Sequence, residues 1–131
     1  MRKKTVWIID DDPIYQIIVN KIIQKSELFS KISSFKNGKD AIDAIQIATE
    51  INDDIPDIIL LDINMPIMDG WEFMDEMHHV SFTHKNNIVV YIVSSSIAIE
   101  DKNKSKTYSN ILGYLSKPIT INNLELIANS I

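Results

Sequence analysis

Four aspartates stand directly after two of the most apolar runs in this sequence. They are Asp10, Asp11 and Asp12, which follow TVWII, and Asp62, which follows DIILL. Crowded carboxylates repel one another, so one of them should have a raised pKa unless a cation neutralises the group. Mg²⁺ takes oxygen ligands of this kind and keeps positions for phosphate oxygens. The acids therefore indicate a metal site, except that Asp12 before Pro13 is better explained as a helix cap.

Asp62 could act as a nucleophile, because a carboxylate that leaves a buried strand can accept a phosphoryl group as an acyl phosphate. Such a transfer needs a metal and a cationic side chain to neutralise charge. Lys117 is the candidate cation, and Ser94 could donate its hydroxyl to a phosphoryl oxygen. Each has an ordinary alternative, since a lysine before proline is usually solvated and a serine after a strand is usually a turn residue. Tyr114 by itself is typical of a half-buried strand.

Other familiar chemistries lack their residues in this chain. The sequence has no cysteine, so it has no thiolate nucleophile, and the soft metal ligands are His78, His79 and His84. These histidines have no metal-ligand spacing, and we interpret them as surface residues. The Gly-rich signatures of dinucleotide and P-loop phosphate sites are absent from the sequence. The sequence therefore favours oxygen-ligand chemistry at the aspartates.

The elements that must position these residues alternate between strand and helix. Continuous apolar runs predict buried parallel strands, and two weaker runs could complete a sheet of five. The runs lie at 5–9, 31–35, 57–61, 88–93 and 111–115. The alternation predicts a doubly wound α/β fold with helices on both faces of the sheet. Ligands of such sheets bind at the carboxyl ends of the strands, where the aspartates, Ser94 and Lys117 stand.

Five helical patterns follow the strands, and they begin near Pro13, Gly38, Gly70, Ile99 and Thr120. The first helix should bury the isoleucines at i, i+3, i+4 spacing, which are Ile14, Ile17, Ile18, Ile22 and Ile23. The fourth helix, over 99–108, has almost no apolar stripe and should pack loosely. Residues 80–87 are expected to form an exposed loop.

Composition bounds the class of protein. A chain of 131 residues that is 45% hydrophobic can fill one core and is too short for two ordinary domains, so we expect one domain over 1–131. A net charge of −5 argues against nucleic acid as a partner. No apolar stretch approaches the roughly 18 residues of a membrane span, and the basic start has too few apolar residues for a signal peptide. The expected location is the cytoplasm.

Four fragments, in this order, resemble the receiver domain of two-component response regulators. They are IIDDDP near the N-terminus, IILLDINMPIMDG in the middle, IVSSS after the fourth strand and YLSKP near the end. The most specific fragment is D-x-N-M-P-x-M-D-G, and the match extends from residue 5 to the end of the chain. The resemblance implies a flavodoxin-like receiver fold in a chemotaxis-regulator-like protein that is a phosphoacceptor rather than an enzyme.

The resemblance also implies roles for individual residues around a Mg²⁺ ion. Asp62 would accept the phosphoryl group and contact the metal. Asp10 and Asp11 would form the acidic pair that holds Mg²⁺, with Asp11 as the direct ligand and Asp10 acting through water. Asn64 would supply its backbone carbonyl to the metal. Asn64 and Ser96 also stand at positions that tune the lifetime of the phosphoryl group in the family.

A second set of residues matches the parts of the family that bind the phosphoryl group and report it. Lys117 would pair with the phosphoryl oxygens, and Pro118 often follows this lysine through a cis bond. Ser94 would donate its hydroxyl to the phosphoryl group. Tyr114 matches the aromatic whose rotamer couples to that hydroxyl when the domain switches. The switch would repack the surface of the fourth helix, the fifth strand and the fifth helix.

The implied partners are proteins. The donor would be a sensor histidine kinase or a histidine phosphotransfer domain, and the downstream target is unknown. The chain would be a monomer or a phosphorylation-dependent dimer. It would be either a single-domain regulator or a receiver cut from a larger one, since 131 residues leave no room for an output domain.

Two other functions compete with this one. A haloacid-dehalogenase-type phosphatase also forms a phosphoaspartate, and Asp10 and Asp12 are similar to its first motif. However, Ile14 replaces the usual Thr or Val, and no second acidic pair follows Lys117. The other alternative is a pseudo-receiver, a binding module that keeps the fold and acts without phosphorylation.

Overall fold

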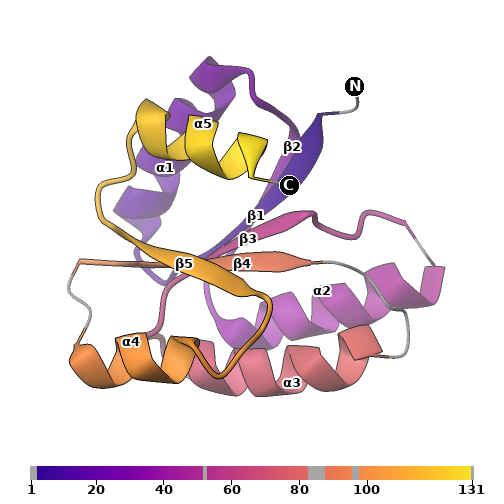
Figure 1. Ribbon diagram of the computed structural model, residues 1–131. Coiled ribbons are helices and arrows are strands. Elements are labelled where there is room, and N and C mark those ends of the chain that lie inside the picture. Colours follow the sequence, from indigo (N-terminus) through magenta and orange to yellow (C-terminus); the bar gives the residue numbers. More distant parts are fainter. Residues whose placement is uncertain (1–2, 52, 83–87, 96–97, 131) are drawn as a thin grey trace.

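Five parallel strands form one sheet in the computed structural model, which describes residues 3–51, 53–82, 88–95 and 98–130 (Figure 1). The strands are β1 (Lys4–Ile9), β2 (Phe29–Phe35), β3 (Ile58–Leu61), β4 (Val89–Ser94) and β5 (Ile111–Ser116). Their order across the sheet is β2-β1-β3-β4-β5. Since β2 and β3 lie on opposite sides of β1, the winding direction reverses there, and such a reversal is where sheets of this kind bind ligands. The predicted five-stranded parallel sheet is confirmed.

Helices cover both faces of the sheet. They are α1 (Pro13–Ser26), α2 (Gly38–Ile51), α3 (Gly70–Phe82), α4 (Ile99–Ser105) and α5 (Ile121–Asn129). Helices α1 and α5 lie on one face, and α2, α3 and α4 lie on the other (Figure 1). This arrangement is the predicted doubly wound fold. Within the described ranges, no helix is both long enough and apolar enough to span a membrane.

Side chains from the central strands alternate between two cores. On β1, Trp7 and Ile9 belong to the cluster that includes α2 and α3, whereas Val6 and Ile8 belong to the cluster that includes α1 and α5. A one-residue slip of β1 would exchange these sets, so burial on both faces fixes the register of the strand. That register determines which residue stands first beyond the carboxyl end of β1.

Side-chain caps fix where the helices begin near this edge of the sheet. The carboxylate of Asp12 accepts hydrogen bonds from the backbone amides of Ile14 and Tyr15 at 3.0 and 3.2 Å, which confirms its predicted capping role. Asp69 and Glu72 cap α3 reciprocally, with bonds of 2.8 and 3.0 Å between each carboxylate and the other residue's amide. Such caps contribute about 1 kcal/mol each and hold the loops before the helices in place.

The buried face of α1 agrees with the predicted one at Ile22 and Ile23 and differs from it at the other three isoleucines. Its exposed isoleucines are Ile14, Ile17 and Ile18, at 69%, 59% and 48%. The buried residues are Val19 and Ile23, and Ile22 packs against them while partly exposed. Isoleucines occur on more than one side of this helix, so spacing alone allowed two apolar stripes, and only one of them contacts the sheet.

The ends of α3 and α4 also differ from prediction. Helix α3 continues to Phe82, so residues 80–82 are helical rather than part of the loop predicted at 80–87, and residues 83–87 lie outside the described part of the chain. Helix α4 ends at Ser105 rather than Tyr108. The amides of Thr107 and Tyr108 bond to carbonyls three residues back, which tightens the chain into turns. Ser105 is the buried residue of α4, in agreement with the thin apolar stripe.

Candidate metal centre

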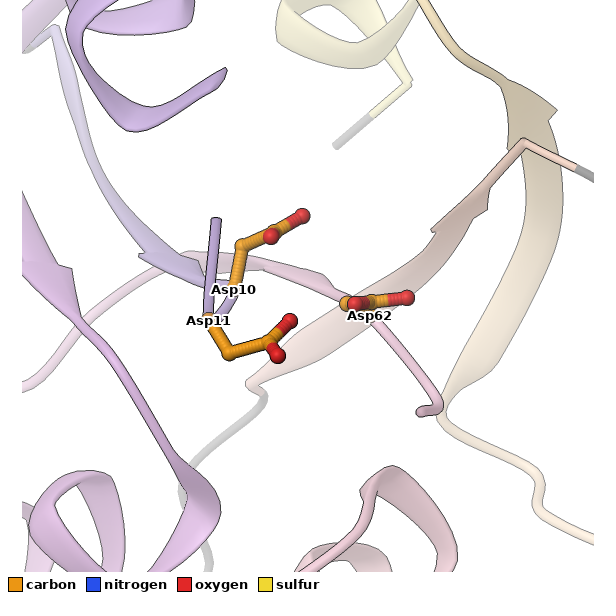
Figure 2. Close-up of side chains that lie close together, drawn as sticks. All are labelled: Asp10, Asp11 and Asp62. Atoms are coloured by element: carbon orange, nitrogen blue, oxygen red, sulfur yellow. The ribbon is translucent and has the colours of Figure 1, made fainter. Parts of the chain in front are cut away.

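Three carboxylates converge at the carboxyl edge of the sheet. One ligand oxygen from each of Asp10, Asp11 and Asp62 can be chosen so that all three lie within 4.8 Å of one another. Figure 2 shows the first two side chains leaving the end of β1 and the third leaving the end of β3. Asp10 and Asp62 are buried, at 2% and 8% exposure, whereas Asp11 is exposed. The cluster therefore has a buried floor and an open side.

Backbone hydrogen bonds hold two of these acids in place. The amide of Asp10 donates to the carbonyl of Phe35 at 3.0 Å, and the amide of Asp62 donates to the carbonyl of Ile9 at 2.9 Å. These two bonds continue the hydrogen-bond ladder of the sheet by one residue beyond the ends of β1 and β3. The two carboxylates thus start from backbone that is as fixed as the sheet itself, and this favours a preorganised site.

Gly70, the first residue of α3, packs directly against the backbone of the acceptor loop. Its amide donates to the carbonyl of Ile63 at 2.8 Å. A Cβ at this position would lie 2.7 Å from the carbonyl oxygen of Asp62 and 2.9 Å from the Cα of Ile63. Contacts this short with backbone cannot be relieved by a side-chain rotation. The sequence had indicated only that a helix begins near Gly70, whereas the structure adds a close backbone contact that excludes larger residues.

Lys117 joins the acids from the end of β5. Its ammonium nitrogen lies 2.6 Å from Oδ2 of Asp10 and 3.9 Å from Oδ2 of Asp62. The backbone amide of Lys117 donates to the carbonyl of Ser94 at 2.9 Å, and the bond to Pro118 is cis. With a side chain only 19% exposed, Lys117 is not the solvated loop lysine that the sequence alone allowed.

The acid cluster raises the pKa of Asp62 to about 6. Burial is the largest cause, because it disfavours the charged form of the carboxyl group. The carboxylate of Asp10 is the next, because it repels a second negative charge. The ammonium of Lys117 opposes the shift without cancelling it. One acid of the cluster therefore has the raised pKa that the sequence predicted for crowded carboxylates.

The remaining predicted site residues that the structure describes lie on β4, in the loop after β3 and on β5. Ser94 is the last residue of β4 and is 4% exposed. Asn64 is exposed in the loop after β3. Tyr114 lies in β5 with 43% exposure, and the ammonium of Lys102 from α4 lies 5.0 Å from its ring centroid. Ser96 lies outside the described residues.

Sequence reasoning missed two residues of α1 that contact the site. The ring of Tyr15 lies 4.4 Å from the ammonium of Lys117. The side-chain amide of Gln16 donates to the carbonyls of Asp10 and Phe35, both at 3.0 Å, and so ties the ends of β1 and β2 together. The signal available was position, since both residues lie in the first turn of a helix capped beside the acids.

The donor set fits a hard divalent cation. Three carboxylates and one ammonium leave a formal charge of −2 when all are ionised, and the donor atoms are oxygens. The open side at Asp11 leaves room for water and a further ligand, as Mg²⁺ requires. The residues present therefore fit a Mg²⁺ site in which the ion keeps part of its water shell.

Comparisons with known proteins agree with this fold. Residues 6–129 match the model of the response regulator receiver domain. The nitrate/nitrite response regulator protein NarL of Escherichia coli K12 is 33% identical over 91 residues, which are 70% of this chain and 38% of NarL. The chain thus spans well under half the length of that relative.

Two solved structures extend the likeness over nearly the whole chain. A two-component response regulator from Cytophaga hutchinsonii has 33% sequence identity and a TM-score of 0.88, with 98% of this chain and 96% of that chain covered. One from Legionella pneumophila has 29% identity and a TM-score of 0.81, with 98% and 100% covered. The chain belongs to the response regulator receiver domain family.

Receiver domains share a general chemistry. Receiver domains accept a phosphoryl group on an aspartate, bind Mg²⁺ in an acidic site and interact with histidine kinases and phosphotransfer proteins. They are generally not enzymes. One curated relative is named as an enzyme, the protein-glutamate methylesterase/protein-glutamine glutaminase of Desulfotalea psychrophila. This chain matches it over 80 residues, which are only 20% of the length of that enzyme.

Proposed function

We propose that this chain is a phosphoacceptor response regulator receiver, in which Asp62 takes a phosphoryl group from a sensor histidine kinase or a histidine phosphotransfer protein. One observation carries the proposal. Asp62 is buried at the end of β3, with two further carboxylates and the ammonium of Lys117 close to it. A lone buried carboxylate needs none of these neighbours, whereas a phosphoryl acceptor needs both a metal site and a cation.

The proposed reaction is a direct displacement at phosphorus. A carboxylate oxygen of Asp62 attacks the phosphorus of a donor phosphohistidine, and the phosphorus–nitrogen bond breaks. The imidazole leaves with the electron pair of that bond and takes up a proton. With a pKa of about 6, Asp62 is mostly ionised near neutral pH and can act as the nucleophile without a separate base.

The surrounding residues neutralise the charge that builds on the phosphoryl oxygens. Asp10, Asp11, Asp62 and the backbone carbonyl of Asn64 would hold Mg²⁺, which supplies positive charge beside these oxygens. The ammonium of Lys117 needs to move little from its present place, 3.9 Å from Asp62, to reach the same group. In this proposal the hydroxyl of Ser94 donates a hydrogen bond to a third oxygen.

The output face is proposed to consist of α4, β5 and α5. Its exposed apolar side chains are Ile99, Leu112, Tyr114, Ile121 and Leu126. Phosphorylation would draw Ser94 toward the phosphoryl group, and Tyr114 would turn inward from its exposed position. Helix α4 could then repack at low cost, because little of it is buried. A downstream protein, or a second copy of the chain, would read the change.

We further propose that residues 1–131 act as one receiver unit in the cytoplasm, where phosphohistidine donors are formed.

The first experiment on the phosphoacceptor proposal measures intact mass after incubation with acetyl phosphate and Mg²⁺. The parent should gain about 80 Da, one phosphoryl group, and this gain should require Mg²⁺. Asp62→Asn should not gain this mass, whereas Asp43→Asn, at an exposed helix position, should behave like the parent. A parent that gains no mass would contradict the proposal and favour a pseudo-receiver.

A further inference from the structure

An aromatic ring from α1 covers the lysine of the acidic site. The ring centroid of Tyr15 lies 4.4 Å from the ammonium nitrogen of Lys117, inside the range of a cation–π contact. The same nitrogen lies 2.6 Å from Asp10 and 3.9 Å from Asp62. The ammonium is therefore held by carboxylates and by the face of a ring at the same time.

The fold holds this ring in place independently of Lys117. Tyr15 lies in the first turn of α1, where its amide donates to the capping carboxylate of Asp12 at 3.2 Å. Its side chain also packs against the core cluster that contains Val19 and Ile23. The backbone and the side chain of Tyr15 are thus both anchored. The ring therefore offers the ammonium of Lys117 a contact whose position does not depend on Lys117 itself.

The electrostatics of the ring suit this role. Burial is the main cause that raises the pKa of the Tyr15 hydroxyl, and the nearby carboxylates of Asp10 and Asp62 raise it further. The side chain therefore stays neutral at every physiological pH, and its ring face keeps the negative quadrupole that attracts a cation. The hydroxyl is not required for that attraction.

Lys117 depends on such a positioning contact more than the aspartates do. The aspartates are short and leave fixed backbone, whereas the ammonium sits at the end of a flexible four-carbon stem. Its closest partner is Asp10, which also helps to hold Mg²⁺ in the proposed function. A ring that keeps its place when Asp10 turns to a metal would leave the ammonium beside Asp62.

We propose that Tyr15 is a positioning residue for Lys117, holding the ammonium beside Asp62 through its ring face. This inference rests on the proposed function and adds to it a residue that acts through Lys117. Tyr15 itself does not contact the reacting atoms in this account. The proposal assigns a role to the aromatic character of position 15 and none to its hydroxyl.

The rate of phosphorylation by acetyl phosphate tests the proposal. Tyr15→Phe keeps the ring and should stay within about twofold of the parent rate, since the cation–π contact is retained. Tyr15→Leu keeps an apolar side chain without a ring and should be about 3- to 30-fold slower. A leucine variant that matches the parent rate would overturn the proposal.

The same substitution in a protein that lacks Lys117 separates a positioning role of Tyr15 from a general structural role. In Lys117→Ala, the reaction should be slow, and adding Tyr15→Leu should slow it no further, because the tyrosine then has nothing to position. If Tyr15→Leu slows the reaction equally in both backgrounds, its role is structural and the proposal is wrong. Thermal melting of each variant controls for loss of fold.

Nuclear magnetic resonance tests the contact without any phosphodonor. The Hε protons of Lys117 should be shifted upfield by the ring in the parent and in Tyr15→Phe, and should return to ordinary values in Tyr15→Leu. Unshifted Hε protons in the parent would contradict the contact itself. If the parent shows the shift but accepts no phosphoryl group, the proposed function fails, and the positioning role fails with it although the contact stands.

Discussion

The ammonium of Lys117 lies 2.6 Å from a carboxylate oxygen of Asp10, and this contact joins the end of β5 to the end of β1 across two intervening strands. Since Asp10 is only 2% exposed, removing the lysine would leave a buried negative charge without its closest cation. In metal-free buffer, Lys117→Met should lower the free energy of unfolding by about 3 kcal/mol, measured by urea unfolding.

A matched surface pair provides the control for this prediction. Lys39 and Asp43 also form an ion pair, at 3.1 Å, but both side chains are more than half exposed. Lys39→Met should change the free energy of unfolding by no more than about 0.5 kcal/mol. Equal effects at Lys117 and Lys39 would mean that the buried pair has no special weight.

Asp62 makes stability depend on pH in a defined direction. Its pKa is about 6 in the folded chain and ordinarily 3.8, so between these values the folded chain binds more protons than the unfolded chain. The contribution of this group to the free energy of unfolding therefore falls as pH rises through that window. In buffer that contains a chelator, the free energy of unfolding of Asp62→Asn at pH 7.5 should exceed that of the parent by about 1 to 2 kcal/mol, after allowance for solvent screening.

This stability difference should shrink toward zero near pH 4, where Asp62 is protonated in the folded chain. Urea unfolding of both proteins at the two pH values checks the prediction. Asp43→Asn is the control, because this carboxylate is exposed and lies on α2, outside the acid cluster. A gain that is the same at pH 4 and pH 7.5 would argue against a raised pKa at Asp62.

Adjacent aspartates should respond differently to Mg²⁺. Asp11 belongs to the acid cluster, whereas Asp12 caps α1 through the amides of Ile14 and Tyr15. Asp11→Ala should weaken Mg²⁺ binding by at least about tenfold, because even indirect partners of metal ligands have effects of that size. Asp12→Ala should bind Mg²⁺ with nearly the parent affinity and lose about 1 kcal/mol of stability.

Isothermal titration with MgCl₂ and thermal unfolding measure these two quantities separately. In the parent, Mg²⁺ at 100 times its dissociation constant should add about 2.7 kcal/mol to the free energy of unfolding. Should Asp12→Ala weaken Mg²⁺ binding as much as Asp11→Ala does, the assignment of the acids would need to shift by one residue.

Two glycines offer a test of the close packing beside the acceptor. At Gly70 a Cβ would meet the backbone of Asp62 at 2.7 Å, and at Gly113 it would meet only the ring of Tyr91 at 3.6 Å. Gly70→Ala should therefore destabilise the fold by about 1 to 3 kcal/mol and slow phosphorylation, because the acceptor loop must shift. Gly113→Ala should be tolerated, as judged by thermal unfolding and by the rate of phosphorylation. Equal tolerance at both positions would contradict the close approach at Gly70.

The sequence was sufficient for the sheet and for the residues at its edge. Three strands follow continuous apolar runs and two follow weaker ones, and parallel strands bring their carboxyl ends to one side, so the meeting of Asp10, Asp62 and Lys117 followed from topology. The role of Asp12 was also predictable, because capping depends on neighbouring residues alone. These are features that local sequence determines.

The features that were not predicted depend on how elements turn relative to one another. The rotation of α1 about its axis decides that Val19 faces the sheet while Ile14 faces solvent, and two apolar stripes in the sequence allowed either outcome. The same rotation brings the ring of Tyr15 over Lys117. The contact of Gly70 with Asp62 likewise joins a helix start to a loop. Both residues belong to the fragment D-x-N-M-P-x-M-D-G, but their spacing does not show that the two backbones touch.

The central claim is that Asp62 is the phosphoryl acceptor, and chemical trapping tests it most directly. The parent, incubated with acetyl phosphate and Mg²⁺, is treated with borohydride, which reduces an acyl phosphate on aspartate to the alcohol and leaves homoserine. Peptide mass spectrometry then locates the modified residue. The account predicts homoserine at position 62 in the Mg²⁺-treated sample and its absence when a chelator is added. Homoserine at position 10 or 11, or a phosphoryl group that survives reduction on another residue type, would contradict it.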